Sequence, residues 1–315
     1  MLQIIRDGTV IPFMKIRLPV EAACLAAVAA AVVMMAVRGL NWGLDFTGGI
    51  VAELRFSQAM DLEDVRGAFA AQGLEGVVQH FGSPRDVVLR VAPHEQLQAE
   101  EVTARAMEAA RGLDDQAVLT RSEFLGPAVG EELVESGVIA IAVSLLAILA
   151  YIAFRFEWRM ATGAVISLAY DVIIVLGVFA WLQIEYDLST LAALLTVVGY
   201  SLNDKIVVFD RVRENATRLS RALRMDELFD VSLSQTLSRT LITSGTTLVT
   251  SVALLIFGGE MIYGFALALT IGVVFGTFSS IYVASTWALM LGIERSHLLP
   301  LPVEVKESDG VESMD

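Results

Sequence analysis

Three ionisable residues stand inside long apolar stretches of this sequence. Asp171 lies within residues 160–182, and the neighbours Asp204 and Lys205 lie within residues 189–209. A charge at the depth of a lipid bilayer is costly, so each such residue is a hypothesis of function by default, often in a proton or ion pathway. Uptake and release of a proton is the simplest chemistry that the Asp204 carboxylate could perform there.

A partner for Asp204 is expected on a neighbouring helix, because residues adjacent in sequence do not face each other on a helix. The next apolar stretch begins at Arg239, and hydroxyl residues follow on one helix face: Thr240, Ser244, Thr247 and Ser251. An aspartate that faces this arginine and these hydroxyls predicts a wet, proton-exchanging site. The alternative is hydrogen bonding between helices alone. We expect the long stem of Lys205 to carry its charge towards the membrane surface.

Six apolar stretches could carry these residues across a membrane. The 315 residues are 55% hydrophobic and 18% charged, with a mean hydropathy of +0.64; a soluble domain carries about 25% charge. A spanning helix needs about 20 mostly apolar residues. This predicts a multi-pass α-helical membrane protein with six spans: residues 18–37, 134–154, 160–182, 189–209, 241–257 and 264–291. Glu21 and Glu135 lie near span ends, where we expect them to reach the interface.

The first span is expected to stay in the chain as a signal anchor. It follows Arg6, Lys15 and Arg17, but its apolar run is too long for the core of a cleaved signal peptide. A lipoprotein cleavage site before Cys24 is not expected, because Glu21 stands where an apolar residue is needed. Cys24 is interpreted as a small apolar residue inside the span.

Lysines and arginines in the short connections predict the orientation. Three precede the first span, two lie in the turn after the second, and six lie in the one long connection between the later spans, residues 210–240. The short connections on the other side have none. Both termini, residues 1–17 and 292–315, are therefore expected in the cytoplasm, and residues 38–133 outside. An outward-facing domain without an organelle signal suggests a bacterial inner membrane.

Residues 38–133 predict an α+β domain of the ferredoxin-like, split βαβ type. Asp61 is the expected helix cap and Gly73 the helix stop, and residues 82–86 are expected to form a hairpin connection. The strands and helices are expected in the order βαββαβ: residues 50–56, 61–73, 77–81, 87–91, 93–112 and 116–124. No catalytic constellation stands out, so we expect no enzyme. Sixteen acidic residues against eight basic ones could favour basic unfolded chains.

The remaining composition argues against several classes. A net charge of −14 leaves no basic surplus to neutralise phosphates, so nucleic acid is not an expected partner. A single cysteine excludes a disulfide framework and a cysteine zinc site, and three scattered histidines do not predict a metal site. The last span has a small residue at every fourth position from Gly264 to Ala284, a face on which another helix can pack closely.

Four segments of the sequence are distinctive. The longest is VGYSLNDKIVVFDRVREN at residues 198–215, and the other three are GLDFTGG at 43–49, SQTLSRTLITSGTT at 234–247 and SSIYVAS at 279–285. They closely resemble the SecF family of bacterial protein-export subunits, and the longest resembles the signature of the family's fourth span. DFTGG alone would also fit the sister family, SecD. The resemblance covers essentially the whole chain, in the family's order and topology.

The resemblance implies a subunit that pairs with SecD in a twelve-span unit of the resistance-nodulation-division type. Such a unit associates with the SecYEG channel, often with YajC, within the membrane lipid. It uses the proton gradient, and no other cofactor, to assist late translocation and release of unfolded polypeptide, while SecA consumes the ATP. On the family pattern Asp204 is the proton-coupling carboxylate and Arg239 its partner. The supporting residues are Asn203, Asp171, Thr243, Ser244 and Thr247.

The sequence departs from the family pattern at Lys205, where a small hydroxyl or similar residue is usual. A cation beside Asp204 would favour the charged form of its carboxyl if both side chains pointed the same way. Two alternatives stay open. One is a proton-driven exporter of small molecules or lipids, which usually carries both six-span halves in one chain. The other is a passive assembly factor of the export channel, in which the buried charges are only structural.

Overall fold

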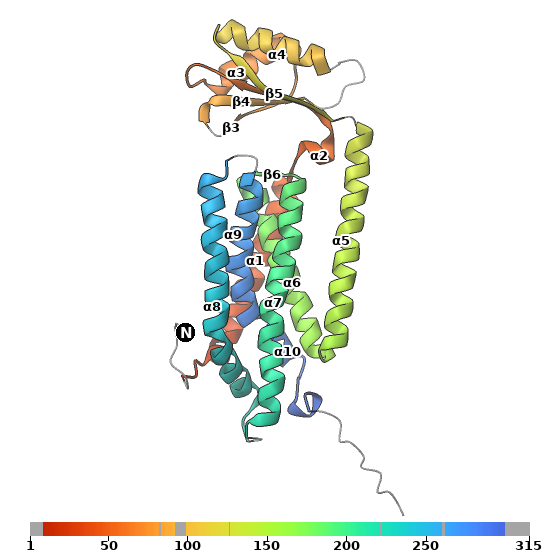
Figure 1. The fold of residues 1–315 in the computed structure, drawn as a ribbon, viewed down its shortest axis with the longest axis vertical. Helices are drawn as coiled ribbons and strands as arrows, with labels where there is room; N and C mark the ends of the chain where they lie inside the picture. The colour runs from red at the N-terminus through yellow and green to blue at the C-terminus, as the bar shows by residue number, and fades with distance from the viewer. Residues whose placement is uncertain are drawn as a thin grey trace, which may run out of the picture.

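The fold has two layers, a long helical bundle and a sheet domain over one end of it (Figure 1). It was obtained as a computed structural model that describes residues 9–299, apart from residues 82, 92–98, 126, 221 and 260–261. Within the described residues, six helices are long and apolar enough to cross a membrane: Phe13–Arg38, Glu135–Arg155, Trp158–Leu182, Leu188–Arg218, Met225–Phe257 and Tyr263–Met290. The predicted multi-pass helical architecture is confirmed.

The bundle is built from seven helices and two short 3-10 turns in the described part of the chain. In chain order these are η1 (Phe13–Ile16), α1 (Arg17–Arg38), α5 (Pro127–Arg155), α6 (Trp158–Leu182), α7 (Leu188–Arg218), α8 (Met225–Phe257), α9 (Tyr263–Ile281), α10 (Val283–Met290) and η3 (Arg295–His297). Parts of the predicted elements lie outside the described residues: residues 1–8, Gly82, Pro93, Arg221 and 300–315.

The segment 210–240, predicted as one long connection, is mostly helical. α7 continues to Arg218 and α8 already begins at Met225. The Asn215 amide donates to Ser232 Oγ and to Gln235 Oε1, each at 2.9 Å. The facing apolar side chains of the two helices are buried in one cluster. Packing between two amphipathic ends therefore extends both helices past the stretches that hydropathy alone identifies.

The small residues of α9 pack against α7 of the same chain. A Cβ added at Gly276 would lie 2.9 Å from Ser201 Oγ, and one at Gly264 would lie 2.6 Å from Thr190 Oγ1. Close approach of two backbones is what a face of small residues permits. The predicted last span is not one helix, because α9 ends at Ile281 and α10 begins at Val283.

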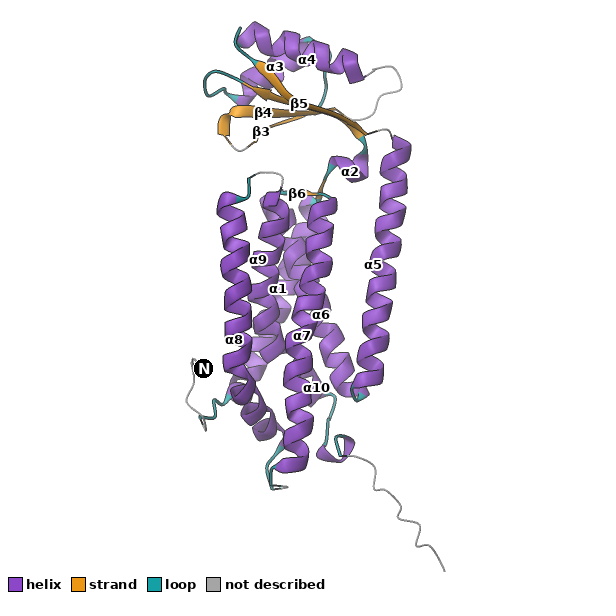
Figure 2. Cartoon of the chain, in the orientation of Figure 1, coloured by secondary structure: helices purple, strands orange, loops and turns teal. Residues whose placement is uncertain are grey.

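The sheet domain has the predicted order βαββαβ. Its elements are β2 (Gly49–Arg55), α3 (Leu62–Ala71), β3 (Val77–Phe81), β4 (Ser83–Val91), α4 (Ala99–Leu113) and β5 (Val118–Leu125). The strands lie in the order β3-β4-β2-β5 with antiparallel neighbours, and α3 and α4 lie on the face turned away from the bundle (Figure 2). Asp61 Oδ1 accepts from the Glu63 amide at 2.9 Å, which confirms the predicted cap.

The connection predicted at residues 82–86 is shorter than expected, because β4 already begins at Ser83. Asp86 is therefore a strand residue. Burial of its carboxyl opposes ionisation, but hydrogen bonds from Arg55 Nε at 2.6 Å and Ser83 Oγ at 2.8 Å outweigh that effect. Together they hold the pKa of Asp86 below its ordinary value.

A short joint connects the two layers. It contains β1 (Asn41–Trp42), α2 (Leu44–Thr47) and β6 (Glu185–Tyr186), with β1 and β6 paired in parallel. Asp45 Oδ2 accepts from the Leu188 amide, the first residue of α7, at 2.9 Å. Arg90 of β4 forms an ion pair with Glu185. The start of α7 is thus held by the segment that leads from α1 into the sheet domain.

Candidate functional site

A buried ion pair lies at the centre of the bundle, between α6 and α7. Lys205 Nζ lies 3.0 Å from Asp171 Oδ2, and both side chains have no exposed surface. Ser201 Oγ donates to the same carboxylate oxygen at 2.5 Å. Lys205 also donates to Ser201 Oγ and, at 3.4 Å, to Ser279 Oγ of α9. The ammonium is thereby surrounded by acceptors from three helices, as a buried charge requires.

The expectation that Lys205 extends towards the membrane surface is wrong. Residues adjacent on a helix point about 100° apart at 3.6 residues per turn. Lys205 therefore faces α6 and α9, while Asp204 faces α8. The cation does not point the same way as Asp204, and its partner is Asp171, on another helix.

Asp204 is a buried carboxylate with an incomplete set of partners. It is 3% exposed, and its Oδ2 has no hydrogen-bond partner among the described residues. The carboxylate meets the Ser244 hydroxyl of α8, which is also hydrogen-bonded to Thr277 Oγ1 of α9 at 2.7 Å. Native proteins leave few buried polar atoms unpartnered, so the free Oδ2 marks a place where a further group can bind.

Arg239 lies at the same α7–α8 contact, closer to the end of the bundle away from the sheet domain. It is exposed and lines a cavity of about 540 Å³ together with Asn203, Asp210 and Gln235. No ion pair between Arg239 and Asp204 occurs in the described chain. Both Lys205 and Arg239 act on the Asp204 carboxylate electrostatically, and Lys205 has the larger effect. The predicted pair is therefore not in direct contact.

The hydroxyl residues of α8 divide into two groups. Ser244 and Ser251 are buried and pair with hydroxyls of α9; the Ser251 Oγ accepts from Thr270 Oγ1 at 3.1 Å. Thr243 and Thr247 instead donate to carbonyl oxygens of their own helix, at 2.9 and 3.1 Å. Of the predicted supporting hydroxyls, Ser244 contacts Asp204, whereas Thr243 and Thr247 bind their own helix.

Glu21, near the start of α1, is a buried residue. It is 6% exposed, and its Oε1 accepts from Trp287 Nε1 of α10 at 2.7 Å. The sequence analysis did not assign Glu21 or Lys205 to a site. The position of Ser201, one helical turn before Lys205, could have identified one acceptor for the ammonium. No residue near Glu21 in the sequence indicates a contact with α10.

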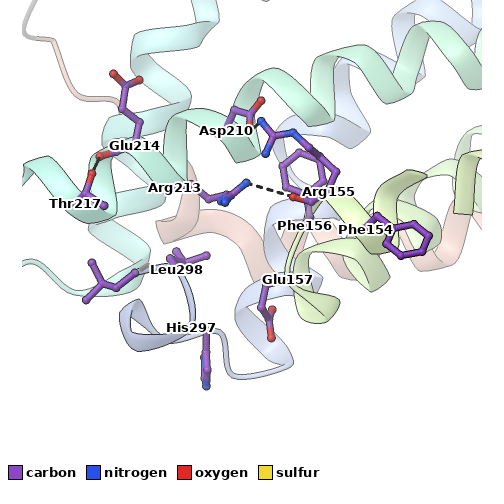
Figure 3. A pocket seen from close by; sticks show the side chains of 11 residues that line it. Phe154, Arg155, Phe156, Glu157, Asp210, Arg213, Glu214, Thr217, His297 and Leu298 are labelled. Atoms are coloured by element: carbon purple, nitrogen blue, oxygen red, sulfur yellow. Dashed lines mark hydrogen bonds and ion pairs between the residues drawn. The ribbon is translucent and has the colours of Figure 1, made fainter. Parts of the chain in front are cut away.

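A second cavity, of about 800 Å³, lies where the turn between α5 and α6 meets the far end of α7 (Figure 3). Arg155 donates to Asp210 Oδ1 at 2.5 Å, and Arg213 reaches the Arg155 carbonyl at 3.2 Å. Arg155 and Asp210 thus form an ion pair in the wall of this cavity. Neither Asp171 nor Asp204 lines this cavity, so it is separate from the candidate site.

Comparison with known proteins gives a consistent result. The family described as "Protein export membrane protein SecD/SecF, C-terminal" matches residues 106–294, and the "SecD/SecF GG Motif" matches residues 33–60. A protein translocase subunit SecF of Vibrio alginolyticus is 49% identical over 96% of this chain and 97% of its own length. The chain belongs to the SecF branch of the SecD/SecF family. The SecF of Escherichia coli O157:H7 is 47% identical over 89% of this chain and 87% of its own length.

The solved structures agree with this SecF assignment. The crystal structure of SecDF from Thermus, described as a translocon-associated membrane protein, superposes with a TM-score of 0.82 at 38% identity. The match covers 92% of this chain and 40% of that longer one. This chain therefore spans about two fifths of the SecDF polypeptide.

Proposed function

We propose that this chain is the SecF subunit of a SecD–SecF complex in a bacterial inner membrane, with both termini in the cytoplasm. It uses the proton motive force to assist translocation of unfolded proteins through SecYEG, driven by SecA, and their release outside. YajC is a further expected component. The names of the relatives support a role in protein translocation, and the charges of the short connections support the orientation.

The observation that carries the proposal is the environment of Asp204. Its carboxylate is buried, one oxygen is unpartnered among the described residues, and its sequence neighbour Asn203 lines a polar cavity together with Arg239. A proton-coupling group must be stable both charged and neutral. Asp171 does not meet this condition, because its carboxylate is bound to the Lys205 ammonium. Asp204, whose guanidinium partner is close but not in contact, does.

In the proposed cycle Asp204 takes up a proton from the outside. Neutralisation weakens its attraction to Arg239 and changes the packing of α7 against α8. Because Asp45 holds the first residue of α7, movement of that helix is transmitted to the sheet domain, which binds and releases the emerging chain. One charge that falls through 100 mV supplies about 2.3 kcal/mol, which is enough to bias a two-state element more than tenfold.

Replacement of Asp204 tests the proposal. After depletion of the wild-type chain, secreted precursors should accumulate, and they should disappear on re-expression of the wild type but not of Asp204→Asn. The matched control is Glu135→Gln, which removes an exposed carboxylate from another span and should rescue fully. The amount of the Asp204→Asn chain in the membrane should be unchanged. If Asp204→Asn restored export fully, the proton-coupling role would be refuted and the chain would be a passive assembly factor of the export channel.

A purification separates the proposal from export of small molecules. The tagged chain, solubilised in mild detergent, should recover a SecD-type six-span partner and the SecYEG channel. The chain has six candidate spans among its described residues and corresponds to about two fifths of the longer SecDF polypeptide. Recovery of a six-span partner without the channel would favour an exporter of small molecules or lipids.

A further inference from the structure

Three helices that meet away from Asp204 enclose several buried polar atoms without a partner. Glu21 of α1, Ser167 and Asp171 of α6, and Ser285 and Thr286 of α10 each have a side-chain atom that forms no hydrogen bond within the described chain. All five side chains are more than nine-tenths buried. Such atoms are rare in native proteins, so their concentration at one three-helix contact calls for a chemical explanation.

The packing of the helices places Glu21 and Ser167 at the same height in the bundle. A Cβ added at Gly177 of α6 would collide with Ala31 of α1, so the two parallel helices touch there. Ten residues earlier on each helix lie Ser167 and Glu21, which therefore stand at the same height. About four turns before Gly177 and on nearly the same face of α6, Gly163 packs against the backbone of α10 at Ala284. Trp287 of α10 completes the contact through its hydrogen bond to Glu21.

The two buried carboxylates of this contact have different counter-groups. Asp171 has the Lys205 ammonium at 3.0 Å. Glu21 has only the neutral indole N–H of Trp287, and no lysine or arginine pairs with it in the described chain. The other titratable side chains that face it are uncharged, namely Cys24 of α1 and Tyr170 of α6, which are hydrogen-bonded to each other.

A buried carboxylate without a cation is not stable in its charged form. The penalty for burying an unpaired ion is several kcal/mol, and a buried acid commonly avoids it by binding a proton. Lys205 cannot serve both acids, because its ammonium is held by Asp171, Ser201 and Ser279. The positive charge that neutralises Glu21 must therefore be a proton taken up from solution.

We propose that Glu21 is a second proton-binding carboxylate of this chain, with the proton on Oε2 and the Trp287 hydrogen bond on Oε1. Ser167, Ser285 and Thr286 supply further hydroxyls where α6 packs on α1 and α10. The site lies on α1, which leads directly into the joint and the sheet domain. The inference goes beyond the role proposed for Asp204 and does not depend on it.

Infrared spectroscopy tests this assignment directly. The chain is purified with its SecD-type partner, reconstituted in liposomes, and difference spectra are recorded between acidic and alkaline buffer. A protonated carboxyl in apolar surroundings has a carbonyl band well apart from that of a carboxylate, and this band shifts in D₂O. We expect one such band to be absent in Glu21→Gln, which preserves the acceptor for Trp287, and to be unchanged in Glu135→Gln.

A second variant keeps the test decisive if Glu21→Gln assembles poorly. Trp287→Phe removes the N–H donor but leaves the acid, so the same band should move to higher frequency. Spectra of Glu21→Gln or of Trp287→Phe that superpose on the wild type would overturn the proposal. Asp204→Asn should remove a different band from the infrared difference spectrum. An Asp204 variant that exports normally would therefore refute the proposed function while the Glu21 band remained.

Discussion

The Asp171–Lys205 pair predicts a strong energetic coupling between two helices. The pair has no exposed surface, and its ammonium has acceptors from α6, α7 and α9. Asp171→Asn would leave the ammonium with neutral acceptors only, and Lys205→Met would leave the carboxylate with the Ser201 hydroxyl only. Breaking a buried pair by removal of one partner costs about 3–5 kcal/mol. Each single variant should therefore shift the folding equilibrium by about two powers of ten or more.

The double variant should be less destabilised than either single one. With both charges gone, no buried ion lacks a partner, and a buried pair replaced by neutral groups is often close to neutral in stability. A double-mutant cycle on the reconstituted chain, read by equilibrium unfolding, measures the coupling energy. We expect a coupling of about 3 kcal/mol or more, from the penalty that the two single variants share.

A surface pair in the same bundle provides the matched control. Arg155 and Asp210 join α5 and α7 at 2.5 Å, but both side chains are 39% exposed. Exposed pairs contribute about 0–1 kcal/mol, so the same cycle should give a small coupling there. If the costs of Asp171→Asn and Lys205→Met simply add, the two side chains do not form a buried pair, and the reasoning is refuted.

Three further predictions concern packing, the joint and acid stability. Gly177→Ala should force α1 away from α6 and cost about 1–3 kcal/mol in the same unfolding measurement, whereas Gly245→Ala, with open space around its added Cβ, should not destabilise. Arg90→Gln should speed hydrogen–deuterium exchange in β1 and β6 but not in β3; equal exchange in wild type and variant would show that the ion pair with Glu185 does not hold the joint. The pKa of Asp86 is lower in the folded domain than in the unfolded chain. The ionised carboxylate therefore stabilises the folded domain above the unfolded-state pKa, and this stabilisation is lost as the pH falls through the folded-state pKa. Below about pH 4 the sheet domain should therefore lose stability more steeply in the wild type than in Asp86→Asn, as followed by circular dichroism.

Local patterns in the sequence predicted the elements well. Hydropathy identified the six spans, the period-2 alternation identified β2, and Asp61 marked the start of α3. These features depend on neighbours within a few residues, so the sequence contains them directly. The helical ends of α7 and α8 were missed because they are stabilised by packing on each other rather than by lipid.

The partners in the site could not be predicted in the same way. Lys205 and Asp171 are 34 residues apart, and only the packing of α6 against α7 and α9 brings them together. Glu21 and Trp287 are 266 residues apart. Which side of a helix faces which neighbour depends on the arrangement of the whole bundle, and a charge in a span says only that some partner exists. The position of Asp204 was predictable, but its free oxygen was not.

The long separation between Glu21 and Trp287 has a consequence for biosynthesis. The ribosome makes α1 first, and the nascent chain carries Glu21 into the membrane before α6 and α10 have been translated. At that stage the carboxyl faces lipid, headgroups or the insertion machinery, and inserting a charged acid alone would be costly. The packing surface for α1 is therefore complete only after residues 158–182 and 283–290 have been synthesised and inserted. A chain arrested before residue 283 should hold Glu21 in a different environment from that in the finished protein.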